Sequence, residues 1–531
     1  MRILNSFVKS AFLLCTGMIL QSCGQKPEPE PMFSNVVVII SDDHAYTTVG
    51  SYGNEQIRTP NIDRIAAGGT RFANAYANAP ICSASRQSLL TGKYPHASGV
   101  NLLFTPFNDE MNLTVAEQMQ SEGIATAIVG KTHWNDWIYW SYWDEWPSYG
   151  FDTLITGAHW KLYLKDHPAT PIPEHIPTRG NTPHENDILW QKNARMLPAP
   201  YYDEESSGTF LAKSAIDFIQ SQGENRFFLW VAFHEPHAPF NFPVEYAGIY
   251  EPDSLPLPEG SEEDQTWVPE IFRDLSEAER RGIVASYYSS VEYMDKNVGL
   301  ILDELESTSV GEKTLVIYLS DHGYLLNDHS RFEKHSMWAE SIKAPLVFQG
   351  QGISSASVQD ELVEFVDLVP TILDAMGMEA HDALQGASLL PLLTGQGKAI
   401  REYVFSEYLE DNLAMVASKK WKYVFTTGKR DLGLGYATGK GPSGLVHMLY
   451  DLEKDPRETS NLAYEEEYAA LVDSLQGVML KKFLETHPMA HYVPSGLNTI
   501  GKLIWFCEPN DVGDEPGSDL QRIFEKEDIY E

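Results

Sequence analysis

Short apolar runs alternate with helical segments along residues 36–348, and few architectures accommodate that alternation. Five runs are typical of strands buried on both faces of a sheet: 36–40, 125–129, 227–233, 315–319 and 345–348. Helices are expected between them, at 61–68, 114–122, 209–220 and 287–305. This order predicts an α/β fold with a large, mostly parallel sheet and helices on both of its faces.

Polar residues follow four of these strands, at the point where each strand ends. They are Asp42 and Asp43, then Lys131 and His133, then His234 and His237, and finally Asp321 and His322. The carboxyl ends of parallel strands meet at one edge of a sheet, where ligands bind. A single Asp-Asp pair after a strand is more often a loop cap than a site. The repetition over four strands favours a functional site at that edge.

The acidic members of this set predict a metal ion. Adjacent buried carboxylates such as Asp42 and Asp43 repel each other unless a cation or protons offset their charge. Together with Asp321 and His322 they offer several hard oxygens and one imidazole. Oxygen-rich ligation favours calcium or magnesium, and the imidazole leaves manganese and zinc open.

A second feature is the stretch 80–96, PICSASRQSLLTGKYPH. A helix is expected to begin at Cys82 and to end at Gly92 and Pro95. Cys82, Ser85 and Arg86 then share one face of its first turn. A helix N-terminus suits an anionic ligand or an ionised nucleophile. A buried cysteine at the start of an ordinary helix is the plain alternative.

This stretch resembles the signature of the type I sulfatases of the alkaline phosphatase superfamily. The signature is Cys, any residue, Pro or Ala, Ser and Arg, with Leu-Thr-Gly downstream, and here it covers 82–86 and 90–92. Ala84 stands where Pro is commoner, and His322 stands where some members carry Asn, as in the branch that resembles iduronate-2-sulfatase. The resemblance implies an alkaline phosphatase-like fold and a formylglycine made from Cys82 by a maturation enzyme, whose hydrated aldehyde attacks sulfur.

The resemblance also implies a role for each matching residue. The expected catalytic residues are Cys82, Arg86, Lys131, His133, His237 and Lys334. One calcium ion would be held by Asp42, Asp43, Asp321, His322 and the oxygen of residue 82. In that family Arg86 would hold the geminal diol, His237 would protonate the departing alkoxide, and His133 would take the proton when the aldehyde re-forms. His234 and His335 are expected only as supporting residues.

Composition limits the substrate class. Lys and Arg number 39 against 75 Asp and Glu, a net charge of −36 that argues against nucleic acid and anionic membrane surfaces as partners. A pocket can still be locally basic, so we expect a sulfatase acting on a sulfated carbohydrate. Two alternatives remain: a phosphate or phosphonate ester hydrolase of the same superfamily, and a lipid-anchored glycan-binding protein whose Cys82 stays unmodified.

The N-terminus predicts export. Residues 1–23 resemble a lipoprotein signal that ends at Cys23, and 24–32 would form a tether, although plain secretion is an alternative. The protein is then expected to be either lipid-anchored in the bacterial envelope or periplasmic. A lipid anchor would be its only link to a membrane. Cys15, Cys23, Cys82 and Cys507 leave no pair for a structural disulfide, so a large core must stabilise the protein.

Three further parts are expected along the chain. The catalytic domain covers 33–400 and contains an aromatic-rich insertion at 134–208, whose Trp residues with Lys161, Lys165 and Arg179 suit either sugar binding or packing of a lid. Residues 401–531 form a small C-terminal α+β subdomain, with short antiparallel strands, a helix over 464–484 and an acidic tail.

Overall fold

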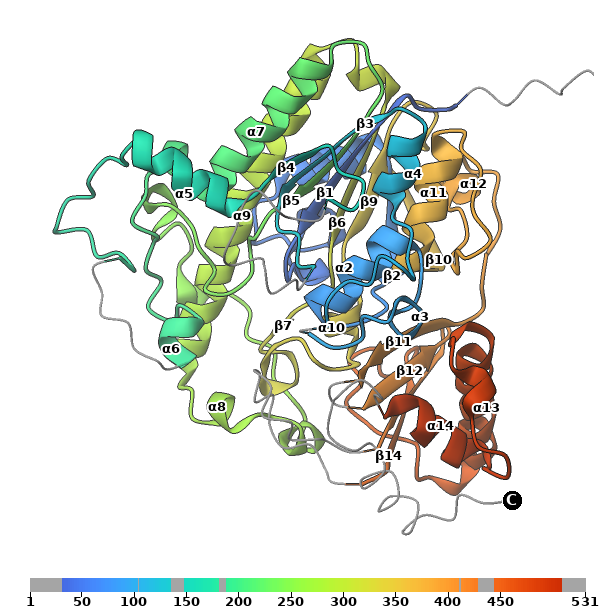
Figure 1. The fold of residues 1–531 in the computed structure, drawn as a ribbon. Helices are drawn as coiled ribbons and strands as arrows, with labels where there is room; N and C mark the ends of the chain where they lie inside the picture. The colour runs from blue at the N-terminus through green and yellow to red at the C-terminus, as the bar shows by residue number, and fades with distance from the viewer. Residues whose placement is uncertain are drawn as a thin grey trace, which may run out of the picture. The chain divides into compact units, whose positions relative to one another are not determined.

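A computed structural model describes residues 31–103, 105–134, 148–180, 188–409, 412–427 and 444–508. Its main feature is an eight-stranded sheet with the order β10-β2-β9-β6-β1-β5-β3-β4 (Figure 1). The strands are β1 Asn35–Ser41, β2 Thr70–Tyr76, β3 Ala125–Gly130, β4 Thr153–Ile155, β5 Phe227–Ala232, β6 Thr314–Ser320, β9 Leu346–Gln349 and β10 Ser357–Glu364.

The large, mostly parallel sheet is the predicted one. The β1 strand pairs in parallel with β5 and β6, and β3 pairs in parallel with β5 and β4. Only β9 runs antiparallel among these eight strands, against β6 and β2. Neither β2 nor β10 was expected, because polar residues such as Arg71 and Asn74, or Gln359 and Asp360, interrupt their apolar character.

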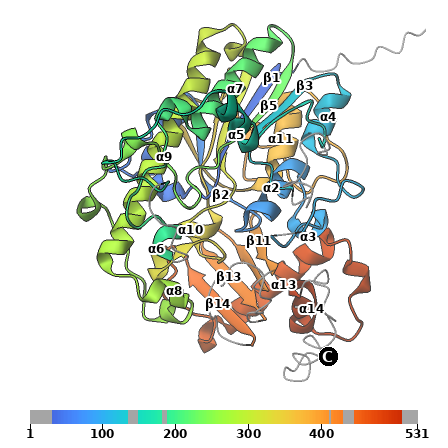
Figure 2. The ribbon, with the colours of Figure 1, turned by 60° about the vertical axis from the view of Figure 1, so that its left-hand side comes forward.

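Helices cover both faces of this sheet, as expected. On β1, Val37 and Ile39 face one core with α1 Pro60–Gly68, α7 Ser207–Gln222 and α9 Glu277–Ser307. Val36, Val38 and Ile40 face the other core with α2 Cys82–Thr91, α4 Val115–Ser121, α11 Leu368–Ala375 and α12 Leu390–Leu393. This alternation follows from the two-residue period of a strand. Figure 2 shows α7 and α9 on one side of the strands, with α2, α4 and α11 on the other.

Shorter elements complete the larger part of the fold. They are α3 Pro95–Ser98, α5 Gly157–Asp166, α6 Ile188–Gln191, α8 Glu270–Arg273, α10 Ala339–Ile342, β7 Leu325–Leu326 and β8 Phe332–Glu333. The helix predicted at 287–305 is longer in the structure, because a capping box between Ser276 and Glu279 starts α9 earlier.

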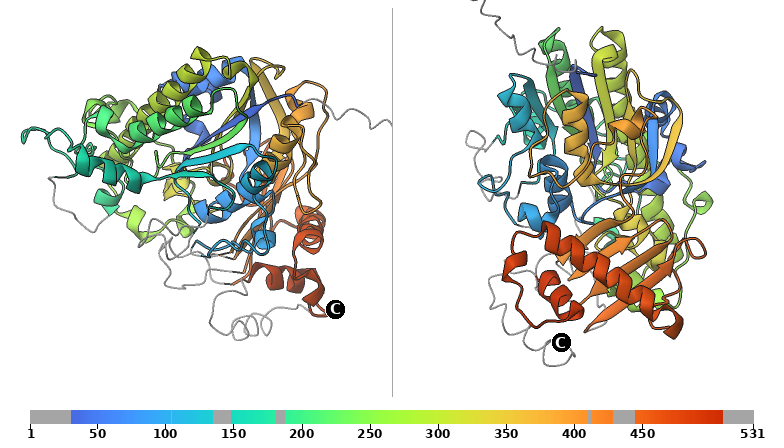
Figure 3. Two further views of the ribbon diagram at one scale, coloured as in Figure 1. Left: turned by 45° about the horizontal axis from the view of Figure 1, so that its top comes forward. Right: turned by 90° about the vertical axis from the view of Figure 1, so that its right-hand side faces the viewer.

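A smaller antiparallel sheet follows near the C-terminus, again as predicted. Its strands are β11 Val404–Tyr408, β12 Leu413–Ala417, β13 Trp421–Thr426 and β14 Val446–Asp451, in sequential order. The helices α13 Ala469–Thr486 and α14 Thr499–Cys507 share an apolar core with these strands. In the right-hand view of Figure 3, α13 lies across the sheet. The sequence pattern did not predict α14.

The described parts of the aromatic-rich insertion make contacts with the rest of the fold. Trp134 packs in the sheet core, and the Trp160 indole donates to the Glu205 carbonyl at 2.9 Å. Lys161 and Lys165 are exposed on α5. The Trp residues 137, 140, 143 and 146, the leader with Cys23, and the acidic tail lie outside the described residues. Within the described ranges, no helix combines the length and apolarity that a membrane crossing requires.

Candidate active site

Four adjacent strands end at the same level of the sheet. Ser41 at the end of β1 is in register with Ser320 of β6, while Ile40 and Gly130 are both in register with Ala232 of β5. The side chains that follow β6, β1, β5 and β3 therefore enter one space. This geometry brings together the acidic and basic groups that the sequence placed on separate loops.

Cys82 lies at the centre of this space, as the first residue of α2. Its Sγ is 3.4 Å from Asp42 Oδ1, 3.3 Å from His322 Nε2 and 3.5 Å from Lys334 Nζ. Asp43 Oδ1 is slightly farther, at 3.9 Å. The contacts come from three separate loops, so residue 82 is the point on which the cluster converges.

The environment of Cys82 corrects one expectation. A helix N-terminus was expected to favour an ionised nucleophile, but burial and the nearby Asp42 carboxylate raise the pKa of the Cys82 thiol well above its usual value. The side chain is 2% exposed, so water does not screen that repulsion. A protonated thiol is a poor nucleophile.

The face of α2 predicted from the spacing of Cys82, Ser85 and Arg86 points into the cluster. Ser85 donates its hydroxyl to the Asp321 carbonyl. Arg86 Nε donates to Asp321 Oδ2 at 2.9 Å, and its Nη2 lies 3.7 Å from Asp42 Oδ1. Arg86 thus joins the carboxylates that follow β1 and β6. It is 2% exposed, so this charge is held in place by the fold.

Lysines surround the two carboxylates that follow β1. Burial by itself would raise the pKa of Asp42, yet Lys131, His237 and Arg86 hold it well below its usual range. Burial opposes ionisation of Asp43 as well, and Lys334 contributes most to lowering its pKa. Lys131 Nζ is 2.5 Å from Asp42 Oδ2, and Lys334 Nζ is 2.5 Å from Asp43 Oδ1. Both carboxylates are consequently ionised and available as ligands.

The donor atoms have the spacing of a cation site. Ligand atoms of Asp42, Cys82, Asp321 and His322 lie within 4.8 Å of one another, and so do those of Asp42, Asp43, Cys82 and His237. Two oxygens on opposite sides of a calcium ion are about 4.6–5.2 Å apart, given bond lengths of about 2.3–2.6 Å. A hydrogen bond of 2.8 Å between His322 Nδ1 and the Gly323 carbonyl leaves Nε2 as an acceptor toward the cluster. The residues present therefore fit a metal ion.

The loop after β3 requires glycine at its start. Gly130 has φ of +118°, and a Cβ added there would lie 1.9 Å from the Ala232 carbonyl oxygen. The next amide, of Lys131, donates to that carbonyl at 2.9 Å. His133 follows with a φ of 58°, and Gln87 of α2 donates to its carbonyl at 3.2 Å. This loop therefore directs Lys131 toward Asp42 and holds His133 against α2, the helix that begins at Cys82.

His133 and His237 occupy different positions in the site. Burial, with Lys131 and Arg86 nearby, lowers the pKa of the His133 imidazole well below its usual value. His237 reaches the surface, with 19% of its side chain exposed, and its Nε2 lies 3.8 Å from Asp43 Oδ2. Burial likewise lowers the pKa of His237 to about 3, and its Nδ1 is 2.7 Å from the Ala238 carbonyl. Both rings are therefore neutral at pH 7.

A loop with unusual backbone carries Lys334. Between residues 327 and 335, five non-glycine residues have positive φ: Asn327, His329, Ser330, Glu333 and His335. Such conformations persist only where surrounding contacts impose them. Here His329 is held by Asp264 at 3.0 Å and stacks on Trp338. This loop conformation places Lys334 between Asp43 and Cys82.

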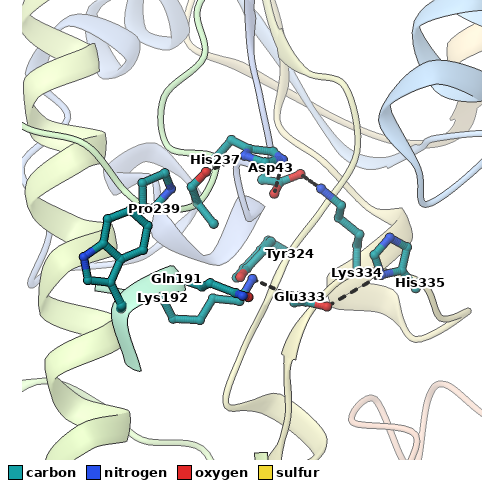
Figure 4. Close-up of a pocket in the computed structure, with 11 residues that line it drawn as sticks. Asp43, Gln191, Lys192, His237, Pro239, Tyr324, Glu333, Lys334 and His335 are labelled. Carbon is teal, nitrogen blue, oxygen red and sulfur yellow. Dashed lines mark hydrogen bonds and ion pairs between the residues drawn. The ribbon is translucent and has the colours of Figure 1, made fainter. Parts of the chain in front are cut away.

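Beside the cluster lies a pocket of about 200 Å³ (Figure 4). Asp43, His237 and Lys334 line it, and Lys334 also lies 3.5 Å from Cys82 Sγ, so the pocket adjoins residue 82. Its other lining residues are Trp190, Gln191, Lys192, Ala238, Pro239, Tyr324, Glu333 and His335. Of these the sequence pattern indicated only Trp190, as one of many aromatic residues, and His335.

Sequence reasoning missed residues that support the site from a distance. Tyr287 of α9 donates to the Asp43 carbonyl at 2.5 Å and accepts from the Ala45 amide at 2.8 Å, which fixes the loop after β1. Asp43 has φ of 66° there. Arg179, for which sugar binding and packing of a lid were both open, is buried, with its guanidinium 3.9 Å from the Trp190 ring. No local sequence pattern signals such long-range partners.

An α/β sheet that collects a buried nucleophile position, carboxylates and lysines at its carboxyl edge defines a hydrolase of the alkaline phosphatase-like fold. Comparison with known families narrows this class. The chain belongs to the Sulfatase family, whose model matches residues 34–378, and a model described as the C-terminal region of N-sulphoglucosamine sulphohydrolase matches 327–485. The protein is therefore a sulfuric ester hydrolase, and the family implies a formylglycine and a metal ion.

Individual relatives agree with this assignment. The chain is 26% identical over 477 residues to an arylsulfatase of Clostridium perfringens, covering 85% of this chain and 94% of that one. It is 24% identical over 544 residues to an N-acetylglucosamine-6-O-sulfatase of Bacteroides thetaiotaomicron, covering 88% and 89%. The solved structure of a phosphonate monoester hydrolase of Agrobacterium radiobacter shares the fold, with a TM-score of 0.71 and 23% identity over 87% of this chain and 97% of that one.

Proposed function

We propose that this sulfatase removes sulfate from a carbohydrate, with residue 82 as formylglycine and calcium as its metal. The observation that carries the proposal is the convergence of Asp42, His322 and Lys334 within 3.5 Å of Cys82 Sγ. A relative named as an N-acetylglucosamine-6-O-sulfatase supports a sugar as the leaving group. The signature from Cys82 to Arg86, at the start of α2, supports conversion of residue 82 to formylglycine.

The chain's own residues would divide the work as follows. Asp42, Asp43, Asp321 and His322 would hold the cation, which would neutralise charge on the sulfuryl group when bound. A hydrated aldehyde at residue 82 would supply an oxygen nucleophile and later release sulfate by re-forming the carbonyl.

Lys131 and Lys334 stand on either side of this position and would bind sulfate oxygens, while Arg86 keeps residue 82 and Asp321 in register. His237, which lines the pocket, would be protonated in response to the charge of the arriving sulfate ester and would give that proton to the leaving oxygen. His133, on the buried side, would accept the proton of the remaining hydroxyl when the aldehyde re-forms and sulfate departs.

The test combines mass and turnover. The protein is produced with and without a formylglycine-generating maturation enzyme, and the peptide that spans residue 82 is weighed. We expect the formylglycine mass only with the maturation enzyme, and turnover in proportion to it. Unmodified cysteine in fully active protein would overturn the formylglycine mechanism.

Substrate class is tested on the matured protein with sulfated saccharides, 4-nitrophenyl sulfate and 4-nitrophenyl phosphate. We expect the sulfate esters to be hydrolysed faster than the phosphate. Faster turnover of the phosphate would favour the phosphate or phosphonate ester alternative, which the fold also accommodates. Binding of sulfated glycans without any turnover would favour the glycan-binding alternative.

The leader supports an exported protein. Residues 1–23 carry a positive start, an apolar stretch and Leu20-Gln21-Ser22-Cys23. We infer acylation at Cys23 and attachment to the bacterial envelope by lipid alone. Labelling with a fatty-acid analogue in wild type and in Cys23→Ala checks this, because label that persists in the variant would exclude Cys23 as the acceptor.

A further inference from the structure

The pocket beside the catalytic cluster contains a buried ion pair that the proposed reaction does not use. Lys192 Nζ and Glu333 Oε1 are 2.5 Å apart, and their side chains are only 6% and 8% exposed. Lys192 follows α6, whereas Glu333 ends β8 and directly precedes Lys334. Figure 4 shows the pair across the pocket from His237, with Glu333 also facing His335 at 3.8 Å.

A second, independent feature lies in the same wall. Tyr324 lines the pocket and is 1% exposed, and its hydroxyl has no hydrogen-bond partner among the residues that the structure describes. Its ring is fixed between Tyr287, with centroids 5.4 Å apart, and Phe240, at 6.0 Å. A buried hydroxyl without a partner is costly, so this position favours a ligand that supplies one.

The charges in this wall are balanced. Lys334 belongs to the catalytic cluster and is assigned to the sulfate that is removed; Lys192 is the other ammonium among the described lining residues, and it is paired with Glu333. An uncompensated positive charge would be needed to attract a carboxylate or a second sulfate on the sugar, because a paired ammonium has already been neutralised. A carboxylate beside an ammonium instead suits hydroxyl groups, because the carboxylate accepts hydrogen bonds from them and the ammonium donates hydrogen bonds to their oxygens.

The pocket also has the size and the apolar wall for one sugar ring. Its volume of about 200 Å³ is below the roughly 300–1,000 Å³ of pockets for drug-sized ligands. Trp190 lines it as a half-buried ring, and the Arg179 guanidinium at 3.9 Å holds that ring in place. Aromatic surface of this kind packs against the C–H face of a sugar while polar groups contact its hydroxyls.

We propose that Tyr324 and the Lys192–Glu333 pair select an uncharged sugar as the sulfate-bearing unit, by hydrogen bonds to its free hydroxyls, and discriminate against uronic acids and doubly sulfated sugars. This inference rests on the proposed carbohydrate sulfatase function. It adds to that function the class of sugar and the residues that choose it.

The test uses the matured enzyme and two sets of probes, monosulfated methyl galactosides and monosulfated methyl glucuronides, with 4-nitrophenyl sulfate as the reference. Wild type is expected to favour the galactoside series by about tenfold or more in kcat/KM. Glu333→Gln leaves the Lys192 charge without its partner, so it should shift this ratio about tenfold toward the glucuronides. Lys192→Met leaves the Glu333 charge instead and should shift the ratio in the opposite direction.

Tyr324→Phe removes only the hydroxyl, and it should lower kcat/KM on the best galactoside about tenfold more than on 4-nitrophenyl sulfate. Tyr288→Phe is the matched control, because Tyr288 is a buried tyrosine of α9 that does not line the pocket. Its hydroxyl accepts a hydrogen bond from the Asn54 side chain at 2.9 Å. The control should leave the substrate ratio unchanged. Opposite ratio shifts in the two charge variants could not come from a general loss of structure.

The outcomes separate this inference from the function beneath it. Preference of the wild type for glucuronides, or equal ratios in Glu333→Gln and Lys192→Met, would overturn the selection proposal and leave a carbohydrate sulfatase. Hydrolysis of 4-nitrophenyl sulfate with no turnover of either sugar series would overturn the carbohydrate function, and this inference with it.

Discussion

Replacing His237 with alanine tests which residue protonates the leaving group. The imidazole has its Nδ1 fixed on the Ala238 carbonyl at 2.7 Å, so Nε2 is the atom that faces the cluster and the pocket. Nε2 lies 3.8 Å from Asp43 Oδ2, beside the place where the sulfate ester must enter. Burial lowers the pKa of the ring and keeps it neutral, whereas the negative charge of an arriving sulfate ester favours its protonation.

The expected loss depends on the leaving group. General acid catalysis contributes about 10²–10⁴-fold, or about 3–5 kcal/mol of transition-state stabilisation. A sugar alkoxide needs that proton, so His237→Ala should lower kcat on a sulfated sugar by about this factor. A nitrophenolate departs almost unaided and loses only a binding hydrogen bond of about 0.5–1.5 kcal/mol, which is about tenfold at most.

The assay compares kcat of wild type and His237→Ala on 4-nitrophenyl sulfate and on a sulfated sugar. His234→Ala is the control, because its ring centroid is 4.9 Å from that of His237 but the residue does not line the pocket. That variant should affect both substrates alike. Equal losses on the two substrates in His237→Ala would refute the acid role and leave His237 as a sulfate-binding residue.

Three further predictions concern the metal, the loop after β3 and the loop that carries Lys334. Chelation should abolish turnover and lower the melting temperature. Calcium should restore turnover better than zinc, because the ligands Asp42, Asp43 and Asp321 supply oxygen atoms. Full activity in protein shown to be metal-free by elemental analysis would contradict this. Gly130→Ala should reduce kcat by at least about tenfold in protein that still folds, because the added Cβ would meet the Ala232 carbonyl oxygen and displace Lys131 from Asp42. A variant with the kcat of wild type would show that residue 130 does not approach Ala232 so closely. Burial opposes the charged form of His329, but Asp264 and Glu340 outweigh it and raise the pKa of His329 to about 9. The charged His329 therefore stabilises the fold by about 3 kcal/mol below pH 6.5, and this stabilisation is lost as the pH rises through 9. Urea unfolding at pH 6.5 and 9 should show the loss in wild type and much less of it in His329→Gln. Equal losses in the two proteins would count against this role of His329.

Local pattern determined much of this protein. The aliphatic runs identified β1, β3, β5 and β6, because a strand covered on both faces must be apolar throughout. The residues after those strands were expected at one sheet edge, and the structure brings them together there. The signature from Cys82 to Arg86 indicated the family, because the chemistry needs those side chains within a single helical turn.

Tertiary contacts decided the remainder. The strands β2 and β10 carry too many polar residues to be recognised alone, and they form because the rest of the sheet offers them an edge. Burial and the nearby Asp42 carboxylate raise the pKa of the Cys82 thiol, which the helix N-terminus by itself did not suggest. Lys334 meets Asp43 across 291 residues of sequence, and Lys192 meets Glu333 in the same pocket. A sequence pattern reports the preferences of neighbours along the chain, whereas electrostatics and substrate selection depend on which groups the fold buries side by side.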